Sequence, residues 1–197
     1  MEIKTNYELE YQKIIKNLTQ KPTLLLHSCC APCSSSVLKK VCKNFNVTIL
    51  YYNPNIYPKE EYLKRKAEQI KLCNLLNIDI LDCDYNEDEF LSKVKGLEQE
   101  AEGGCRCNKC FLIRLEKTAK LAKQNNFDFF GTTLTVSPHK NEQIINKIGK
   151  NLQDKYEISF LFSDFKKQNG YLESINLSKE YNLYRQDYCG CRFSKRN

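Results

Sequence analysis

Short apolar runs alternate with longer amphipathic segments along the first two-thirds of the chain, and this alternation restricts the possible folds most. Each run has five or six residues, the length of a buried strand in a parallel sheet. The runs are Thr23 to Ser28, Val47 to Tyr52, Ile78 to Cys83, Phe127 to Thr132 and Ile158 to Phe162. Strands and helices in alternation predict an α/β fold with a Rossmann-like, doubly wound parallel sheet of about five strands flanked by helices.

Two of the segments between these runs have the periodicity of amphipathic helices, Lys59 to Leu76 and Asn108 to Lys123. Their predicted apolar stripes contain Tyr62, Ala67, Ile70 and Leu75 in the first helix and Leu112, Leu115, Ala119 and Ala122 in the second. A third helix is expected over Ser34 to Cys42. From about Ser163 the pattern is less regular, which predicts an irregular helical C-terminal part that carries cysteines. Since no repeat or Pro/Gly linker divides the chain, residues 1–197 are predicted to form a single domain.

Charge and composition restrict the classes of partner. No apolar run approaches the roughly 20 residues that a membrane-spanning helix needs, so we expect a soluble, cytoplasmic protein without a membrane partner. The chain has 31 Lys and Arg against 24 Asp and Glu, a net charge of +7, together with 12 Tyr and 10 Phe. Such basicity is compatible with a nucleic-acid partner. A solvated, lysine-rich surface explains it equally well.

Cysteine is concentrated at three separated places in the chain. Eleven cysteines are present, and the groups are Cys29-Cys30-Ala-Pro-Cys33, Cys105-Arg-Cys107-Asn-Lys-Cys110 and Cys189-Gly-Cys191. The polar, charged opening from Met1 to Lys21 has no signal-peptide pattern, so we expect an intracellular chain in which disulfides are disfavoured. The Cys-x-x-Cys spacing of Cys107 and Cys110 is typical of metal binding. The grouping therefore predicts a metal centre assembled from distant segments.

The first cysteines directly follow the first predicted strand, at the position where α/β proteins bind ligands. A phosphate loop at this position would contain glycines, and thiols stand there instead. Because adjacent side chains of an extended backbone point apart, Cys29 and Cys30 are predicted to face two different centres. Cys189 and Cys191 are predicted to do the same. With Cys105 left aside, the groups contain seven thiols, of which a 4Fe-4S cluster takes four and leaves up to three for a neighbouring ion.

Other classes of protein are compatible with the same cysteines. A non-redox RNA-binding protein could hold structural zinc, although the only histidines, His27 and His139, lack zinc-knuckle spacing. A thiol reductase could use Cys107 and Cys110, and a sulfur-inserting tRNA enzyme could share the sheet. The sulfur-inserting enzymes normally bind ATP with a glycine-containing loop, which is absent between His27 and Ser36.

Four segments together resemble the cobalamin-independent epoxyqueuosine reductases of the QueH family. They are His27-Ser-Cys-Cys-Ala-Pro-Cys33, Tyr52-Asn-Pro-Asn-Ile56, Gly103-Gly-Cys-Arg-Cys-Asn-Lys-Cys-Phe-Leu-Ile-Arg-Leu115 and Leu183-Tyr-Arg-Gln-Asp-Tyr-Cys-Gly-Cys-Arg-Phe-Ser194. The resemblance covers about residues 22–194. It implies a sheet of the nucleotide α-hydrolase (HUP-like) type and an iron-sulfur oxidoreductase for the last step of queuosine synthesis in tRNA. In that step the epoxide of the modified wobble base becomes an alkene and its oxygen leaves as water.

The resemblance also implies cofactors and their ligands. A 4Fe-4S cluster is expected on Cys30, Cys107, Cys110 and Cys189, and a mononuclear iron on Cys29, Cys33 and Cys191. Cys105 is treated as a bystander. The protons are expected from His27, Tyr188 or a metal-bound water, although a packed strand end explains His27 equally well and a core or stacking role explains Tyr188 better. An external electron donor of the ferredoxin or flavodoxin type is expected.

A tRNA substrate needs cations for its phosphates and aromatic rings for its unpaired bases. The candidate phosphate contacts are Lys166, Lys167, Arg185, Arg192, Lys195 and Arg196, and the candidate stacking rings are Tyr52, Tyr171 and Tyr184. Each residue alone is also explained as an ordinary surface or core residue. The acidic run from Asp82 to Glu89 is interpreted as a solvated loop and helix start.

Overall fold

The computed structural model describes residues 4–194 of the chain. Five strands form one sheet in the order β3-β2-β1-β4-β5, and every neighbouring pair is parallel. The strands are β1 (Thr23–His27), β2 (Asn46–Leu50), β3 (Asp79–Leu81), β4 (Phe129–Thr132) and β5 (Ser159–Phe160). The predicted α/β fold with a five-stranded parallel sheet is therefore confirmed, and each strand lies within or beside its predicted run.

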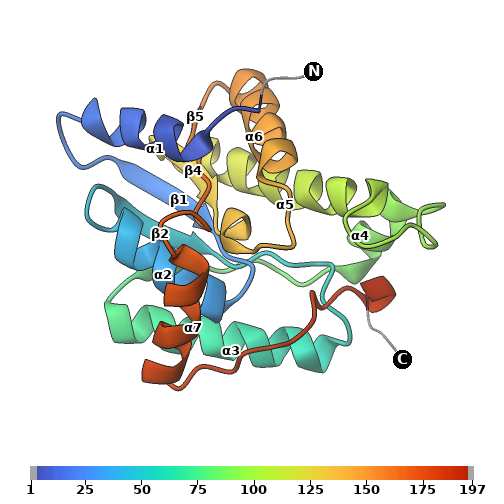
Figure 1. Ribbon diagram of the computed structural model, residues 1–197. Helices are drawn as coiled ribbons and strands as arrows, with labels where there is room; N and C mark the ends of the chain where they lie inside the picture. The colour runs from blue at the N-terminus through green and yellow to red at the C-terminus, as the bar shows by residue number, and fades with distance from the viewer. Residues whose placement is uncertain (1–3, 195–197) are drawn as a thin grey trace.

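Seven α-helices and two 3-10 turns surround the sheet among the described residues. The helices are α1 (Tyr7–Lys16), α2 (Ala31–Val41), α3 (Lys59–Leu76), α4 (Glu87–Val94), α5 (Cys105–Gln124), α6 (Glu142–Tyr156) and α7 (Gly170–Glu180), and the turns are η1 (Leu134–Val136) and η2 (Arg192–Ser194). Helices α1, α2 and α3 cover one face of the sheet, while α5 and α6 cover the other (Figure 1). Helix α7 packs outside α2.

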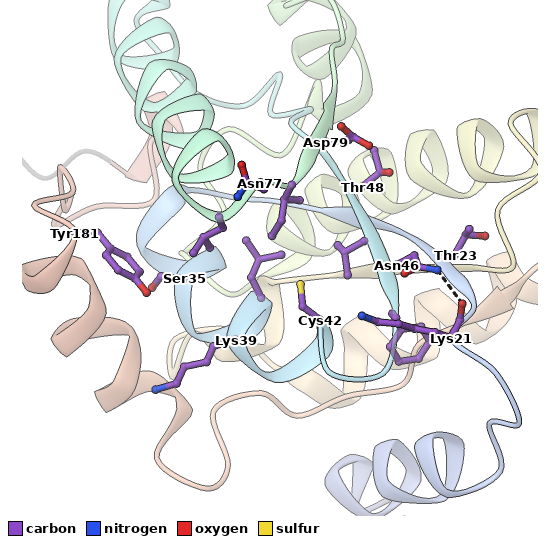
Figure 2. A pocket seen from close by; sticks show the side chains of 15 residues that line it. Lys21, Thr23, Ser35, Lys39, Cys42, Asn46, Thr48, Asn77, Asp79 and Tyr181 are labelled. Atoms are coloured by element: carbon purple, nitrogen blue, oxygen red, sulfur yellow. Dashed lines mark hydrogen bonds between the residues drawn. The ribbon is translucent and has the colours of Figure 1, made fainter.

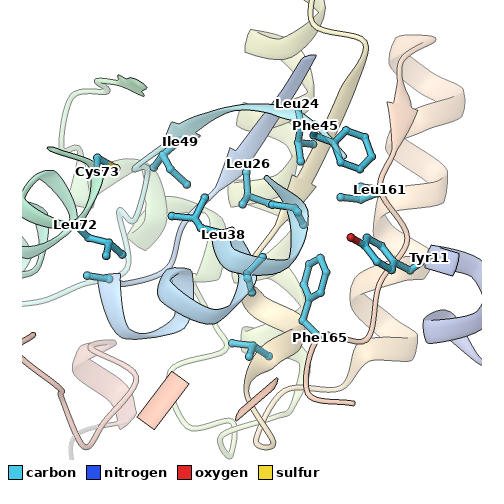
Figure 3. Packing of buried hydrophobic residues seen from close by; sticks show 14 of the residues in the cluster. Tyr11, Leu24, Leu26, Leu38, Phe45, Ile49, Leu72, Cys73, Leu161 and Phe165 are labelled. Atoms are coloured by element: carbon cyan, nitrogen blue, oxygen red, sulfur yellow. The ribbon is translucent and has the colours of Figure 1, made fainter. Parts of the chain in front are cut away.

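Alternating side chains of the central strand supply both halves of the core. Leu24 and Leu26 of β1 pack beneath α1, α2 and α3, in the cluster that Figure 3 shows with Phe45 and Phe165. Leu25 between them faces α5 and α6. A strand buried on both faces explains why its sequence is a continuous apolar run rather than an alternating one.

The helix predictions were correct in position but not always in the buried face. Helix α3 begins and ends at the predicted residues, yet Ile70 and Leu75 of the predicted stripe are exposed. Its buried face contains Tyr62, Arg65, Gln69, Leu72 and Cys73. In α5, by contrast, all of the predicted stripe except the exposed Leu112 is buried. Periodicity misread α3 because two of its buried positions are polar.

Both ends of the described chain contain a helix. The polar opening segment forms α1, which starts at an Asn6 N-cap and buries Tyr11. Helix α7 stands in the C-terminal part that was predicted to be irregular and helical, with irregular stretches before and after it. No helix among the described residues is long and apolar enough to span a bilayer. The single-domain extent, residues 1–197, stays a prediction, and Lys195 and Arg196 lie outside the described residues.

Candidate metal centre

The first cysteine group lies at the carboxyl end of β1, in the turn that leads into α2. Cys30 is the N-cap residue of α2, and Cys33 lies in the first turn of that helix. The Sγ atoms of Cys29, Cys30 and Cys33 all lie within 4.8 Å of one another. The first two are 3.9 Å apart. The expectation that these adjacent thiols point apart is therefore wrong, because the chain changes direction here instead of continuing as a strand.

The second cysteine group lies at the start of α5. Cys110 is buried and packs with Cys191 against Phe90 and Val94 of α4. Cys107 is half-buried, and its sulfur accepts a hydrogen bond from the Gly103 amide at 3.2 Å. Cys105, the first residue of α5, is exposed, as its treatment as a bystander requires.

The C-terminal cysteines reach this place because their segment is tied to the β2–α3 loop. Cys191 forms an antiparallel bridge with Ile56, and the Tyr57 amide donates to the Gly190 carbonyl at 2.8 Å. The buried Arg65 of α3 donates to the Cys189 carbonyl at 3.1 Å. Figure 1 shows this red segment running beside the loop before α3. Contacts of the main chain therefore hold the last cysteines at the site.

Gly190 makes this approach possible. Its φ is +95°, a left-handed conformation that favours glycine. A Cβ at this position would lie 2.9 Å from Nη1 of Arg65 and 3.1 Å from Cγ1 of Ile56. Glycine therefore allows both the turn between the two thiols and the close contact with α3.

A buried guanidinium connects the two cysteine groups. Arg114 is 2% exposed and donates from Nε to Nε2 of His27 at 3.2 Å and from Nη2 to Oδ1 of Asn53 at 2.5 Å. Its third hydrogen bond, from Nη1, goes to Sγ of Cys110 at 3.9 Å. None of these partners is a carboxylate. Burial opposes the charge of Arg114, yet the sulfurs of Cys110, Cys29 and Cys189 raise its pKa above the ordinary value.

Lys140, in the loop before α6, is a second cation of the centre. Burial opposes its charge as well, but the sulfurs of Cys189, Cys29 and Cys33 raise its pKa. Arg114 bonds both to Cys110 and to His27, two residues before Cys29, and so lies between the first and second cysteine groups. The sequence predictions missed both residues. The one available signal was the i, i+4 spacing of Cys110 and Arg114, which places both side chains on one helix face.

Hydrogen bonds between the thiols divide their protons unequally. Bonds from Cys30 and Cys33 to the Cys29 sulfur hold the pKa of Cys29 well below its usual range. The bond to Cys29, together with burial, raises the pKa of Cys30 to about 12. Burial raises the pKa of Cys110 to about 12. Because metals bind thiolates, loading of this centre must release protons.

The two predicted proton donors have different surroundings. His27 is fully buried, and burial together with Arg114 lowers its pKa to about 3. Nε2 of His27 lies 3.2 Å from Nε of Arg114 and 3.2 Å from the Tyr52 carbonyl, while Nδ1 lies 2.9 Å from Oγ1 of Thr132. These contacts fit the packed strand end, and a proton-donor role stays a prediction. Tyr188 is half-buried beside Cys189, with the guanidinium of Arg65 4.9 Å from its ring centroid.

The predicted tRNA contacts differ in how far they are engaged by other residues of the chain. Lys166 pairs with Glu142 at 2.7 Å, and Arg192 pairs with Glu87, whereas Lys167 is exposed. Three further candidates lie on or after α7, namely Arg185, Tyr171 and Tyr184. The guanidinium of Arg185 is 5.4 Å from the centroid of the Tyr171 ring. The ammonium of Lys64 lies over the Tyr184 ring, 3.5 Å from its centroid.

One predicted stacking ring is part of the core. Tyr52 is 2% exposed, and its hydroxyl donates to Oε2 of Glu89 at 2.7 Å. The prediction that it stacks a base is therefore wrong, because a ring between β2 and α5 cannot meet a base from solvent. The acidic run does form a helix start at α4, as predicted, although Glu87 and Glu89 have partners and are not merely solvated.

A pocket of about 580 Å³ lies at the opposite end of the sheet. Figure 2 shows it at the amino ends of β1 and β2, with Thr23, Asn46 and Asp79 around it. None of the seven cysteines of the centre lines it. The pocket is therefore separate from the metal centre.

A parallel sheet of this order, with a cysteine centre beyond its strand ends, defines a Rossmann-like α/β protein with a thiol-rich site. A solved structure of the U34-tRNA thiolase NcsA from Methanococcus maripaludis with its [4Fe-4S] cluster has the same fold, with a TM-score of 0.58 and 13% identity. The match covers 96% of this chain and 67% of that one. At that identity the likeness shows the fold alone.

The family model for epoxyqueuosine reductase QueH matches residues 24–197. The epoxyqueuosine reductase QueH of Staphylococcus epidermidis is 42% identical over 97% of this chain and 85% of its own length. The one from Streptococcus pyogenes is 39% identical over 96% of this chain and 79% of its own length. The relative from Thermotoga maritima is 38% identical over 87% of this chain and 90% of its own length. The chain belongs to the epoxyqueuosine reductase QueH family, which confirms the resemblance in its motifs.

Proposed function

We propose that the cysteine centre is where this chain reduces epoxyqueuosine in tRNA to queuosine, the activity that its family's name states. The observation that carries the proposal is the group of three thiols within 4.8 Å at the carboxyl end of β1. Arg114 connects this group with Cys110, because it bonds both to that thiol and to His27. The reaction adds two electrons and two protons. The epoxide becomes an alkene, and its oxygen leaves as water.

The donor set fits iron. All eleven cysteines lie among the described residues and are free, and thiolates suit iron and iron-sulfur clusters. Thiolates about 2.3 Å from a tetrahedral ion stand ~3.8 Å apart. The 3.9 Å between the sulfurs of Cys29 and Cys30 is close to that value, which by itself favours one ion for both thiols, whereas the family motif divides them between two metals. Seven thiols therefore support a 4Fe-4S cluster beside a mononuclear iron.

We keep the ligand assignment that the family motif implies. The cluster takes Cys30, Cys107, Cys110 and Cys189, and the single iron takes Cys29, Cys33 and Cys191. The structure groups Cys30 with Cys29 and Cys33, so the assignment of Cys30 to the cluster is the part that most needs a direct test. When bound, these groups supply electrons and a Lewis acid for the epoxide oxygen.

The side chains of the centre contribute charge and exclude water. Arg114 and Lys140 offset the negative charge of the thiolates and of the oxygen as its bond to carbon breaks. Burial of Cys29, Cys30, Cys110 and Cys191 keeps water from that side of the centre. In this proposal Tyr188, the residue before Cys189, would hold a proton at its hydroxyl, and the bond from Arg114 to His27 orients Arg114.

The remaining partners follow from the reaction. The substrate is tRNA that carries epoxyqueuosine at the wobble position. The candidate phosphate contacts among the described residues are Lys166, Lys167, Arg185 and Arg192. Electrons come from an external donor of the ferredoxin or flavodoxin type, since a cluster usually passes one electron at a time. The reaction takes place in the cytoplasm, where tRNA is modified.

Anaerobic purification followed by metal and sulfide analysis tests the centre. We expect roughly four or five irons and four sulfides per chain, with a brown colour that dithionite bleaches. The same protein, given dithionite and tRNA that carries epoxyqueuosine, should yield queuosine. Nucleoside mass spectrometry should show a product with one oxygen fewer than epoxyqueuosine. Zinc without sulfide in a colourless, inactive protein would contradict the proposal and favour a structural-zinc RNA-binding protein.

Serine variants test the ligand assignment separately. Cys29→Ser and Cys191→Ser should lose the single iron and keep the sulfide-containing cluster, whereas Cys30→Ser should lose the sulfide. Cys105→Ser is the matched control, because this exposed cysteine belongs to the same segment and should leave both metals in place. Retention of full sulfide in Cys30→Ser would move Cys30 to the single iron.

A further inference from the structure

Tyr57 presents an exposed aromatic ring next to the metal centre. It is 41% exposed, and its amide donates to the Gly190 carbonyl at 2.8 Å, between the two C-terminal cysteines. The preceding residue, Ile56, forms the bridge with Cys191. The backbone of Tyr57 is therefore fixed to the segment that carries two of the cysteines.

The ring itself is also held in place. The guanidinium of Arg192 lies 4.1 Å from the centroid of the Tyr57 ring. Arg192 is in turn paired with Glu87 of α4, which neutralises its charge. A cation on an aromatic ring is stabilising, and an ordered ring loses little entropy when it binds a ligand. Arg192 thus serves to orient the ring and is less available to a phosphate than its sequence suggested.

Few other rings could act in this way. Among the described residues, the large apolar side chains that are more than a third exposed include only two aromatic ones, Tyr57 and Tyr171. Tyr171 belongs to α7, on the outside of α2. Tyr57 is the one whose backbone is bonded to the cysteine segment.

We infer that Tyr57 is a stacking platform for an unpaired nucleobase of the substrate tRNA, an inference that rests on the proposed function. A substrate base in the centre must leave the anticodon loop, and its neighbours then lose a stacking partner. Unstacked bases bind to aromatic faces, and the contact is worth about 1–3 kcal/mol per base. Tyr57 offers such a face at the rim of the centre.

Binding of a fluorescent anticodon stem-loop RNA by the metal-loaded protein tests the inference. Tyr57→Ala should weaken binding about 5- to 150-fold, and Tyr57→Phe should bind like the unaltered protein because it keeps the ring. Tyr57→Leu keeps apolar volume without a π face and should resemble Tyr57→Ala. Iron and sulfide content serve as the folding readout and should be the same in all three variants.

A double-mutant cycle identifies the base. Stem-loops with a single abasic nucleotide at each loop position are compared in the unaltered and Tyr57→Ala proteins, and one position should lose its dependence on Tyr57. Equal affinity of Tyr57→Ala and the unaltered protein, or a zero coupling at every position, would overturn the inference alone. If the unaltered protein neither binds the stem-loop nor reduces epoxyqueuosine, both the inference and the proposed function fail.

Discussion

At the scale of single residues, the centre depends on a buried charge without a carboxylate partner. Arg114 bonds to His27, Asn53 and Cys110 instead. A buried cation is costly unless something compensates it. The sulfurs of Cys110, Cys29 and Cys189 compensate it here, most strongly when metal loading makes them thiolates, so the arginine and the cysteines stabilise each other. Variants of Arg114 should therefore report on the charge of the cysteines through changes in stability and reduction potential.

Replacement of Arg114 should change both stability and reduction potential. Arg114→Gln should lower the unfolding free energy of the metal-free protein by about 1–3 kcal/mol, because buried partners lose their hydrogen bonds. In the metal-loaded protein, the same substitution should lower the reduction potential of the metal centre, since the positive charge that it removes favours the reduced state. Urea unfolding and a dye-mediated redox titration measure the two effects.

Arg114→Lys is the matched control for charge. It keeps the positive charge but loses the planar fork that reaches three partners. We expect its potential to stay near that of the unaltered protein while its stability falls. A potential in Arg114→Gln equal to the unaltered value would show that this charge does not act on the metals.

Gly190 and Gly96 separate steric contact from backbone strain. Both have a positive φ, +95° and +82°. A Cβ at Gly190 would meet Arg65, whereas one at Gly96 would meet nothing within 4 Å. Gly96→Ala should cost only the conformational strain, about 1–2 kcal/mol. Gly190→Ala should cost about 1–3 kcal/mol more by urea unfolding and should lower the iron content. Equal losses in both variants would contradict a role for the Arg65 contact.

At the scale of elements, periodicity and turn position predicted most of the fold. The five strands were predictable because a sheet buried on both faces gives continuous apolar runs such as that ending at His27. The buried face of α3 was not, because Arg65 and Gln69 are buried through hydrogen bonds that a hydrophobic pattern does not record. The same limitation hid Arg114. Hydrogen bonds between distant segments leave no trace in local sequence.

The cysteine groups show the same division. Their meeting at one end of the sheet was predictable, since β1 ends just before Cys29. The mutual approach of Cys29 and Cys30 was not, because it depends on the backbone of one turn. Tyr57 was also missed, since its importance arises from the bridge between Ile56 and Cys191.

Helix α6 allows a test of packing whose sign is decided by one contact. Gly149 of α6 lies against the Phe160 ring of β5, and a Cβ there would overlap the ring. In a free helix, Gly→Ala stabilises by about 1 kcal/mol. Here Gly149→Ala should instead destabilise by about 1–3 kcal/mol in urea unfolding. Adding Phe160→Leu should recover part of the loss, and a stabilising Gly149→Ala would show that α6 can move away from the sheet.

At the scale of the whole molecule, the net charge of +7 predicts that tRNA binding weakens with salt. Neighbouring lysines allow a matched comparison. Lys166 is paired with Glu142 and Asp164, whereas Lys167 is exposed. Lys167→Gln should therefore reduce the slope of log affinity against log salt by about 0.7–0.9 if it meets a phosphate, and Lys166→Gln by less.

A combined variant tests whether the basic residues form one tRNA-binding surface. Removing Lys167 together with Arg185 should flatten the salt dependence further than either change alone. Unchanged affinity and slope in the combined variant would mean that tRNA binds to another face of the protein. Filter binding over a series of salt concentrations measures both quantities.

The uneven burial of the cysteines has a consequence for life in air. Four of the seven are buried, while Cys33, Cys107 and Cys189 remain half-exposed, so the centre is open on one side. Dioxygen is smaller than a nucleobase and can enter wherever the base enters. Bound tRNA should therefore slow the loss of visible absorbance when the loaded protein meets air, and equal bleaching rates with and without tRNA would show another route of entry. In an aerated cell, the lifetime of the iron would then depend on how much of the protein is occupied by its substrate.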